Sequence, residues 1–252
     1  MKIRLPFEVL HEDRDVIVID KPAGMLTTHT KVVGRAAREA QLTAENLLND
    51  YVRKGQLKSR NRVWLVHRLD RETSGVMMFA KSEEVAEYFR SNWNELTEKT
   101  YIAKVVGKME NEQGVYESYL REDDDGYRVR SVKPRGSLGV QCLPRGSLGV
   151  QYCTASDSRA LPKSKFARTE WHTIQTSILP NLQTSLVSVS LKSGRKNQIR
   201  VHFSEAGHPV VGDVKYGGPK SDRLYLHALR LRFRHPHSGK WLTFEAPCGF
   251  SC

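Results

Sequence analysis

Short apolar runs bounded by charged or turn-forming residues recur along the chain, and they restrict it to a fold built mainly on β-strands. The run Val16–Ile19 ends at the turn sequence Lys21–Gly24. Val63–Val66 and Val76–Ala80 are predicted to be buried strands on either side of a polar connection, His67–Gly75. The pattern indicates strands joined by hairpins and loops.

Three segments have helical periodicity: residues 43–51, 82–96 and 198–206. Ser82 is suited to the N-cap of the second segment, and Gly207 to a left-handed residue that ends the third. Strands outnumber these helices, so we expect an α+β fold with a mixed, mainly antiparallel sheet and flanking helices. We expect residues 1–252 to form one domain.

Apolar and basic residues alternate from position 229 to position 234. A strand with this alternation places Arg230, Arg232 and Arg234 on one face and the apolar residues on the other. Trp241–Phe244 is predicted to return as its hairpin partner.

The chain has 40 Lys+Arg against 28 Asp+Glu, a net charge of +12, which favours a polyanionic partner. The segment Lys192–Lys240 alone holds eleven basic residues and three acidic ones. No apolar stretch is as long as a membrane span, and no signal peptide is recognisable. The four cysteines form no CxxC pair, which argues against a disulfide scaffold or a zinc knuckle. A cytoplasmic location is therefore expected.

A repeat with a period of ten residues interrupts the second half: Pro134–Gln141 recurs unchanged as Pro144–Gln151. We interpret residues 133–164 as an exposed loop insertion that contains this duplication. The acidic run Glu122–Asp125 precedes Gly126, which is typical of a solvated hairpin turn; a metal site there would need further ligands.

The segment His67–Gly75 contains an aspartate, Asp70, between Arg68 and Arg71. Neighbouring positive charge favours the ionised carboxylate. The local sequence leaves its role open between nucleophile, general base, metal ligand and structural partner.

HRLDRETSGVMMFAK, residues 67–81, resembles the catalytic motif of RluA-type RNA pseudouridine synthases. Four further elements resemble that family in the same order. They are VIVIDKPAGML (16–26), KTYIA (99–103), SGRKNQIRVHFSEAGHPVVGDVKYGG (193–218), and LHA with HP at 226–228 and 235–236. The resemblance covers nearly the whole chain except the duplicated region, and it implies the pseudouridine synthase fold with a central active-site cleft.

The resemblance also implies a reaction and its residues. The uracil base of an RNA uridine is detached from its ribose, turned and rejoined through a ring carbon, so no cofactor or metal is needed. Asp70 matches the family's catalytic aspartate, Tyr101 the tyrosine that packs on the base, and Arg200 the arginine that pairs with the carboxylate. Arg68 matches the residue that fills the space left by the flipped nucleotide, and Ile199 would form an apolar wall under the base.

Other motif positions suggest contact with RNA. Lys21 and Arg195 are interpreted as structural or RNA-facing, and Arg230 and Arg232 as a surface for the RNA backbone or as solvated charges. Many relatives carry an accessory RNA-binding domain before the first motif, which we do not expect here. We expect a monomer that acts on rRNA or tRNA, with no membrane and no small-molecule partner.

Two other classes are compatible with a basic chain of this kind. A non-catalytic RNA-binding or ribosome-assembly factor could retain the same fold. A metal-dependent nuclease could use Asp70, His67 and the acidic run.

Overall fold

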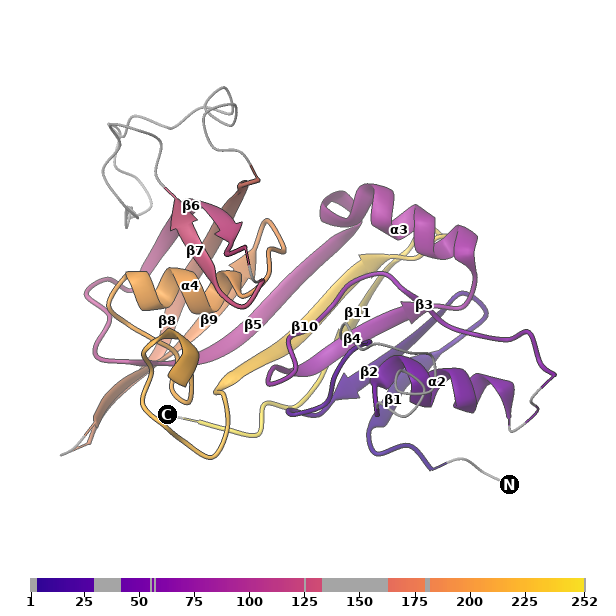
Figure 1. Ribbon diagram of the computed structural model, residues 1–252, viewed down its shortest axis with the longest axis horizontal. Coiled ribbons are helices and arrows are strands. Elements are labelled where there is room, and N and C mark those ends of the chain that lie inside the picture. Colours follow the sequence, from indigo (N-terminus) through magenta and orange to yellow (C-terminus); the bar gives the residue numbers. More distant parts are fainter. Residues whose placement is uncertain are drawn as a thin grey trace. The chain divides into compact units, whose positions relative to one another are not determined.

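The computed structural model describes residues 4–29, 42–54, 56, 58–124, 126–132, 163–179 and 182–251 (Figure 1). Apart from residues 163 and 164, the expected loop insertion lies outside these described residues, as does the duplicated octapeptide. Two compact units divide the chain: unit 1 contains residues 1–99 and 227–248, and unit 2 contains residues 100–226 and 249–252. The expectation of one catalytic domain over residues 1–252 stays a prediction.

Unit 1 is built on a sheet with the strand order β1-β2-β4-β10, in which β11 also pairs with β10 and β3 with β4. The bounds are β1 Glu8–Glu12, β2 Val16–Lys21, β3 Trp64–Leu65, β4 Ser74–Ala80, β10 Leu226–Arg234 and β11 Trp241–Glu245. The pairs are antiparallel except β10 with β4, which is parallel, so the sheet is mixed.

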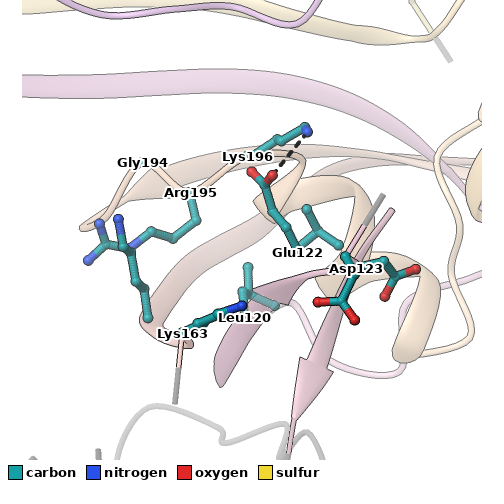
Figure 2. A pocket seen from close by; sticks show the side chains of 10 residues that line it. Leu120, Glu122, Asp123, Lys163, Gly194, Arg195 and Lys196 are labelled. Atoms are coloured by element: carbon teal, nitrogen blue, oxygen red, sulfur yellow. Dashed lines mark hydrogen bonds and ion pairs between the residues drawn. The ribbon is translucent and has the colours of Figure 1, made fainter. Parts of the chain in front are cut away.

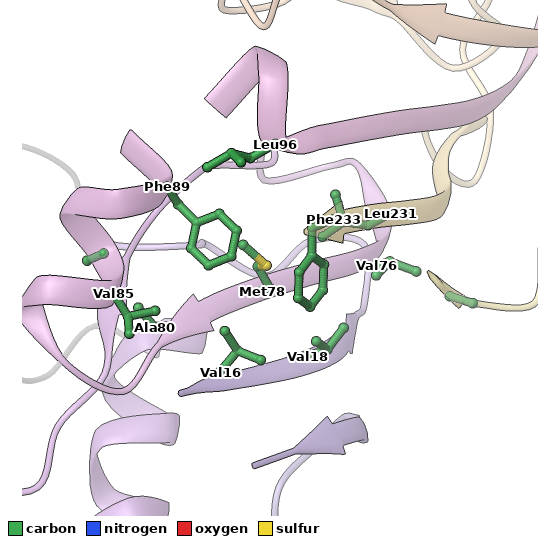
Figure 3. Close-up of a cluster of buried hydrophobic side chains, with 12 residues drawn as sticks. Val16, Val18, Val76, Met78, Ala80, Val85, Phe89, Leu96, Leu231 and Phe233 are labelled. Atoms are coloured by element: carbon green, nitrogen blue, oxygen red, sulfur yellow. The ribbon is translucent and has the colours of Figure 1, made fainter. Parts of the chain in front are cut away.

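The two helices of unit 1 are α2 (Ala44–Arg53) and α3 (Glu83–Leu96). Figure 3 shows Phe89 of α3 over the sheet face that carries Val16, Val18 and Met78. Its ring meets Phe233 of β10 edge-on, with ring centroids 5.7 Å apart. Burying a side chain of this size stabilises the fold by about 2–3 kcal/mol.

Residues with the opposite parity on β2 and β4 point to the other face of the sheet. Ile17 and Met77 are fully buried there. Helix α2 begins at its N-cap Thr43, whose hydroxyl accepts a hydrogen bond from the Asn46 amide, and it buries Ala44, Leu48 and Val52.

Unit 2 is an antiparallel sheet with the strand order β5-β9-β8-β6-β7. The strands are β5 Thr97–Val106, β6 Gln113–Glu122, β7 Val129–Val132, β8 Lys165–Leu179 and β9 Leu182–Leu191. β5 begins in unit 1 and continues into unit 2. Helix α4 (Gln198–Glu205) and the 3-10 turn η2 (Val214–Tyr216) complete the unit.

The α+β class with a mixed, mainly antiparallel sheet is confirmed. Ser82 caps α3 as expected, and Gly207 follows α4 in a left-handed conformation. The helix expected at 82–96 differs in one respect, because Asn92 has non-helical backbone angles and interrupts it. No helix in the described residues is both long enough and apolar enough to cross a membrane.

Candidate active site

Asp70 lies in a loop that is fastened at both ends to the turn after β2. Thr27 Oγ1 donates to the Leu69 carbonyl (2.8 Å), and the Gly24 amide donates to the Arg71 carbonyl (2.9 Å). The Arg71 guanidinium returns a hydrogen bond to the Gly24 carbonyl (3.0 Å). Asp70 is therefore flanked on each side by a residue that is tied to the first motif. These contacts hold the two motifs together in unit 1.

Lys21 is fully buried at the centre of this arrangement. Its ammonium donates to the carbonyls of Pro22 (2.9 Å), Met25 (2.8 Å) and Arg71 (3.2 Å). Carbonyl groups that turn inward without a donor are costly, so the buried cation stabilises both loops. These bonds support the structural interpretation of Lys21, and its contact with RNA stays a prediction.

Gly75 allows the loop to enter β4 directly beside β10. It has a positive φ of 112°, and a Cβ at this position would lie 2.2 Å from the Ala228 carbonyl oxygen. Next to it, Ser74 Oγ lies 2.8 Å from His227 Nδ1, and His227 Nε2 lies 3.1 Å from the Ala246 carbonyl oxygen. The TSG and LHA sequences are thus packed against each other within unit 1.

His67 supports the loop as a neutral side chain. Its Nε2 accepts a hydrogen bond from the Met78 amide (3.0 Å), and its ring stacks on Trp93 (4.6 Å between centroids). Burial, with a smaller contribution from the nearby Lys99 ammonium, lowers the pKa of His67 to about 3. A neutral imidazole that is already bonded to the backbone is a structural group.

The two loop side chains expected to act on the nucleotide are accessible. Asp70 is half-buried and Arg68 is exposed. Between them Leu69 is buried and anchors the loop in unit 1. The middle of the loop is thus buried, while Arg68 is exposed and Asp70 half-buried.

In unit 2, Arg200 extends from α4 and is held by Asp213. Its Nε and Nη2 donate to the two carboxylate oxygens, each at 2.7 Å, and its Nη1 donates to Asn197 Oδ1 (3.2 Å). The side chain of Asp213 is fully buried, and that of Arg200 is 11% exposed. Such a bidentate pair fixes the guanidinium plane. The expected pairing of Arg200 with Asp70 would join the two units, and it stays a prediction.

Tyr216 completes this group of side chains. Its ring lies 5.1 Å from the Arg200 guanidinium carbon, and its hydroxyl accepts from the Val129 amide and from Asn197 Nδ2, both at 3.0 Å. Burial is the main cause that raises the pKa of Tyr216, so its hydroxyl is protonated near neutral pH.

Tyr101 and Ile199 are both buried in unit 2. Tyr101 is 8% exposed in β5, paired with Val189 of β9, and Ile199 is 4% exposed in the first turn of α4. Both positions are compatible with a wall of a base-binding site, and their roles stay predictions.

Gln198 organises the segment that leads into α4, a role that the sequence analysis did not assign. Its Oε1 accepts from Ser193 Oγ (2.8 Å) and the Arg195 amide (3.0 Å), while its Nε2 donates to the Arg168 carbonyl (3.0 Å). Gln198 and Asp213 both belong to the motif at 193–218, so motif membership was the signal that could have found them. The family usually has threonine where this chain has Ser193. The contact with Gln198 uses the side-chain hydroxyl, which serine and threonine both have.

Arg195 lines a pocket of about 410 Å³ in unit 2 (Figure 2). Figure 2 shows Arg195 and Lys163 on one side of this pocket and Asp123 on the other. Lys196 Nζ bonds to Glu122 (3.4 Å) and to the Gly126 carbonyl (2.7 Å). The described part of the acidic run, residues 122–124, leads into the turn of the β6–β7 hairpin, as predicted.

Two arginines of the expected arginine face of β10 are matched by acidic partners, while Arg234 donates to the Gly239 carbonyl. Arg230 pairs with Glu245 (2.9 Å) and Arg232 with Glu98 (3.0 Å). Arg232 also lies over the Trp241 ring. Contact of these arginines with RNA stays a prediction.

One group among the described residues has the spacing of metal ligands: Asp13, Asp15 and His235. It includes neither Asp70 nor the acidic run, which the nuclease hypothesis required.

Fold and sequence together define an RNA-modifying isomerase. The sequence profile of the RNA pseudouridylate synthase family matches residues 15–205, so the chain belongs to this family, whose members convert uridine to pseudouridine.

Individual relatives agree with this assignment. The tRNA pseudouridine synthase C of Vibrio parahaemolyticus is 32% identical over 250 residues, which are 95% of this chain and 89% of that protein. The ribosomal large subunit pseudouridine synthase D of Nitrosomonas europaea is 30% identical over 255 residues, 96% of this chain and 62% of that protein. The structure of human RNA pseudouridylate synthase domain containing 4 has a TM-score of 0.69 at 21% identity, and it covers 95% of this chain and 88% of that one; it supports the fold.

Proposed function

We propose that this RNA pseudouridine synthase uses the Asp70 carboxylate as its nucleophile. The observation that carries the proposal is the position of Asp70, half-buried in a loop whose neighbours Leu69 and Arg71 are bonded to the first motif. A nucleophile is effective when its scaffold holds it before the substrate arrives.

The reaction conserves atoms and electrons. The N1–C1′ bond of uridine breaks, the base turns, and a C5–C1′ bond forms; C5 loses a proton and N1 gains one. In this scheme Asp70 attacks the nucleotide, Tyr101 packs on the base and assists removal of the C5 proton, and Arg200 keeps the carboxylate ionised and oriented. Arg68 occupies the gap left by the flipped nucleotide, and Ile199 lies under the base.

The proposed substrate is a uridine in tRNA or rRNA. The names of the two bacterial relatives specify tRNA and the large ribosomal subunit, respectively. We further propose that no cofactor takes part, because the reaction involves no net redox change. We also propose that the protein acts as a monomer in the cytoplasm.

Replacement of Asp70 by asparagine tests the nucleophile. Since Asn keeps the size but not the nucleophilic charge, pseudouridine formation should fall by at least about a thousandfold. The measurement is single-turnover conversion in total tRNA and rRNA, read by chemical pseudouridine mapping.

Folding and RNA affinity provide the control for this experiment. The Asp70→Asn chain should keep the circular dichroism spectrum and the RNA dissociation constant of the unmodified chain. Pseudouridine formation at the original rate by a folded Asp70→Asn variant would refute the proposal.

A further inference from the structure

The turn of the β6–β7 hairpin presents an aromatic side chain to solvent next to several cations. Tyr127 is 62% exposed, which is unusual for a large aromatic residue. The Lys215 ammonium lies 4.3 Å from the centre of its ring and also bonds to the Tyr127 carbonyl. The side chains of Arg128 and Arg130 are exposed on the same hairpin, where Arg130 pairs with Asp123 (3.2 Å).

A pocket of about 440 Å³ lies beside this turn, between the hairpin, α4 and η2. Its lining includes Arg128, Arg130, Lys215 and Tyr216. Only one acidic residue, Glu205, lines it, and its Oε1 already accepts from the Ser131 amide (3.0 Å). The cavity is therefore positively charged, with aromatic and apolar walls.

A continuous series of contacts leads from this surface to the arginine that was assigned to the active site. Lys215 contacts the rings of both Tyr127 and Tyr216, the latter at 5.6 Å. Tyr216 in turn stacks with Arg200. An RNA strand bound at the hairpin would thus be connected to Arg200 through Lys215 and Tyr216, within unit 2.

We propose that Tyr127, Arg128 and Lys215 form a binding surface for single-stranded RNA that flanks the target uridine. An unpaired base stacks on the Tyr127 ring, and the cations contact adjacent phosphates. Exposed aromatic rings interleaved with cations are the usual means of binding unpaired nucleic acid, because every base has a face for stacking and every nucleotide has a phosphate. That the bound strand flanks a target uridine rests on the proposed function. The binding measurement itself does not depend on that function.

The test measures the dissociation constant of the full chain for a fluorescein-labelled, single-stranded 12-nucleotide RNA of mixed sequence. Tyr127→Ala should bind about 5- to 50-fold more weakly, since it loses one stacked base. Tyr127→Phe keeps the ring and should bind like the unmodified chain. Ile174→Ala is the matched control, because Ile174 is 50% exposed on β8 of the same unit and should not affect binding.

A blunt duplex of the same sequence supplies the second arm, because its bases are already stacked and Tyr127→Ala should change its affinity little. The proposal is overturned if Tyr127→Ala binds the single strand normally, if Tyr127→Phe is as weak as Tyr127→Ala, or if strand and duplex are weakened equally. If Tyr127→Ala weakens binding but the unmodified chain makes no pseudouridine, only the proposed function fails. Normal binding by Tyr127→Ala together with full catalysis contradicts this inference alone.

Discussion

The pair of Arg200 and Asp213 shows how one side chain can fix the orientation of another. Both oxygens of the buried Asp213 carboxylate are committed to Arg200. A long arginine side chain loses much rotamer freedom when it is held in one orientation, and the bidentate contact compensates for this cost. Stability and activity should therefore both depend on Asp213.

Asp213→Asn should lower the free energy of unfolding by about 3 kcal/mol, because it leaves the Arg200 charge without its buried partner. Urea denaturation measures this change. The control is Glu245→Gln, which breaks the exposed pair with Arg230 and should cost no more than about 0.5 kcal/mol. Equal effects of the two variants would show that burial does not strengthen the Arg200 contact.

The lowered pKa of His67 should make the free energy of unfolding depend on pH. Its pKa is about 3 in the folded chain against 6.5 for an ordinary histidine, so between these values the unfolded chain binds more protons. Stability attributable to His67 is complete above about pH 6.5 and falls as the pH decreases, with a slope of at most about 1.4 kcal/mol per pH unit.

His67→Gln should make the dependence of stability on pH less steep between pH 7 and 5, because glutamine can accept from the Met78 amide but does not titrate in this range. Urea midpoints at several pH values measure the slope. A residual slope is expected from His202, whose pKa burial lowers to about 4. If the two chains have the same slope, His67 is not held neutral by the fold.

At the scale of the element, the parallel pairing of β4 with β10 depends on one glycine. His227 pairs with Ser74 and Ala228 with Gly75, where the backbones approach too closely for any side chain. The strand that follows the Asp70 loop is thus positioned by the absence of a Cβ atom.

Gly75→Ala should destabilise the protein by at least about 3 kcal/mol, because a positive φ is combined with a clash against the Ala228 backbone. Gly24→Ala is the matched control: Gly24 also has a positive φ, of 82°, but a Cβ there would meet nothing within 4 Å. It should cost only about 1 kcal/mol. Thermal melts of both variants compare backbone strain alone, in Gly24→Ala, with strain plus a steric clash, in Gly75→Ala. Equal losses of stability in the two variants would contradict a role for the clash.

These elements also show what could be predicted from the sequence. Alternation identified the β10–β11 hairpin and its arginine face, since side-chain direction follows from the period of a strand. It could not identify Glu98 and Glu245 as the partners of those arginines, because pairing depends on which strands become neighbours. Similarly, the family motif indicated Arg200, whereas its contact with Asp213 depends on the path of the chain after α4.

For the whole molecule, the question raised by the net charge of +12 is which basic residues are available for phosphates. Lys21 is used internally by backbone carbonyls, and Arg200 by Asp213. Arg230 and Arg232 are balanced by glutamates. Arg130 pairs with Asp123 (3.2 Å). Arg128 is exposed and lines the pocket beside η2. A basic composition therefore indicates a polyanionic partner but does not locate its surface.

The salt dependence of RNA binding distinguishes these surfaces. Each phosphate contact to a single strand adds about 0.7 to the slope of log Kd against log salt concentration, because bound counterions are released. Arg128→Gln should lower the slope by about 0.7, whereas Arg230→Gln should change it little, since Glu245 already balances that charge. Titrations of the labelled 12-nucleotide RNA in KCl concentrations from about 50 to 200 mM measure both slopes. A lower slope for Arg230→Gln alone would place the RNA backbone on the β10–β11 face instead of the hairpin.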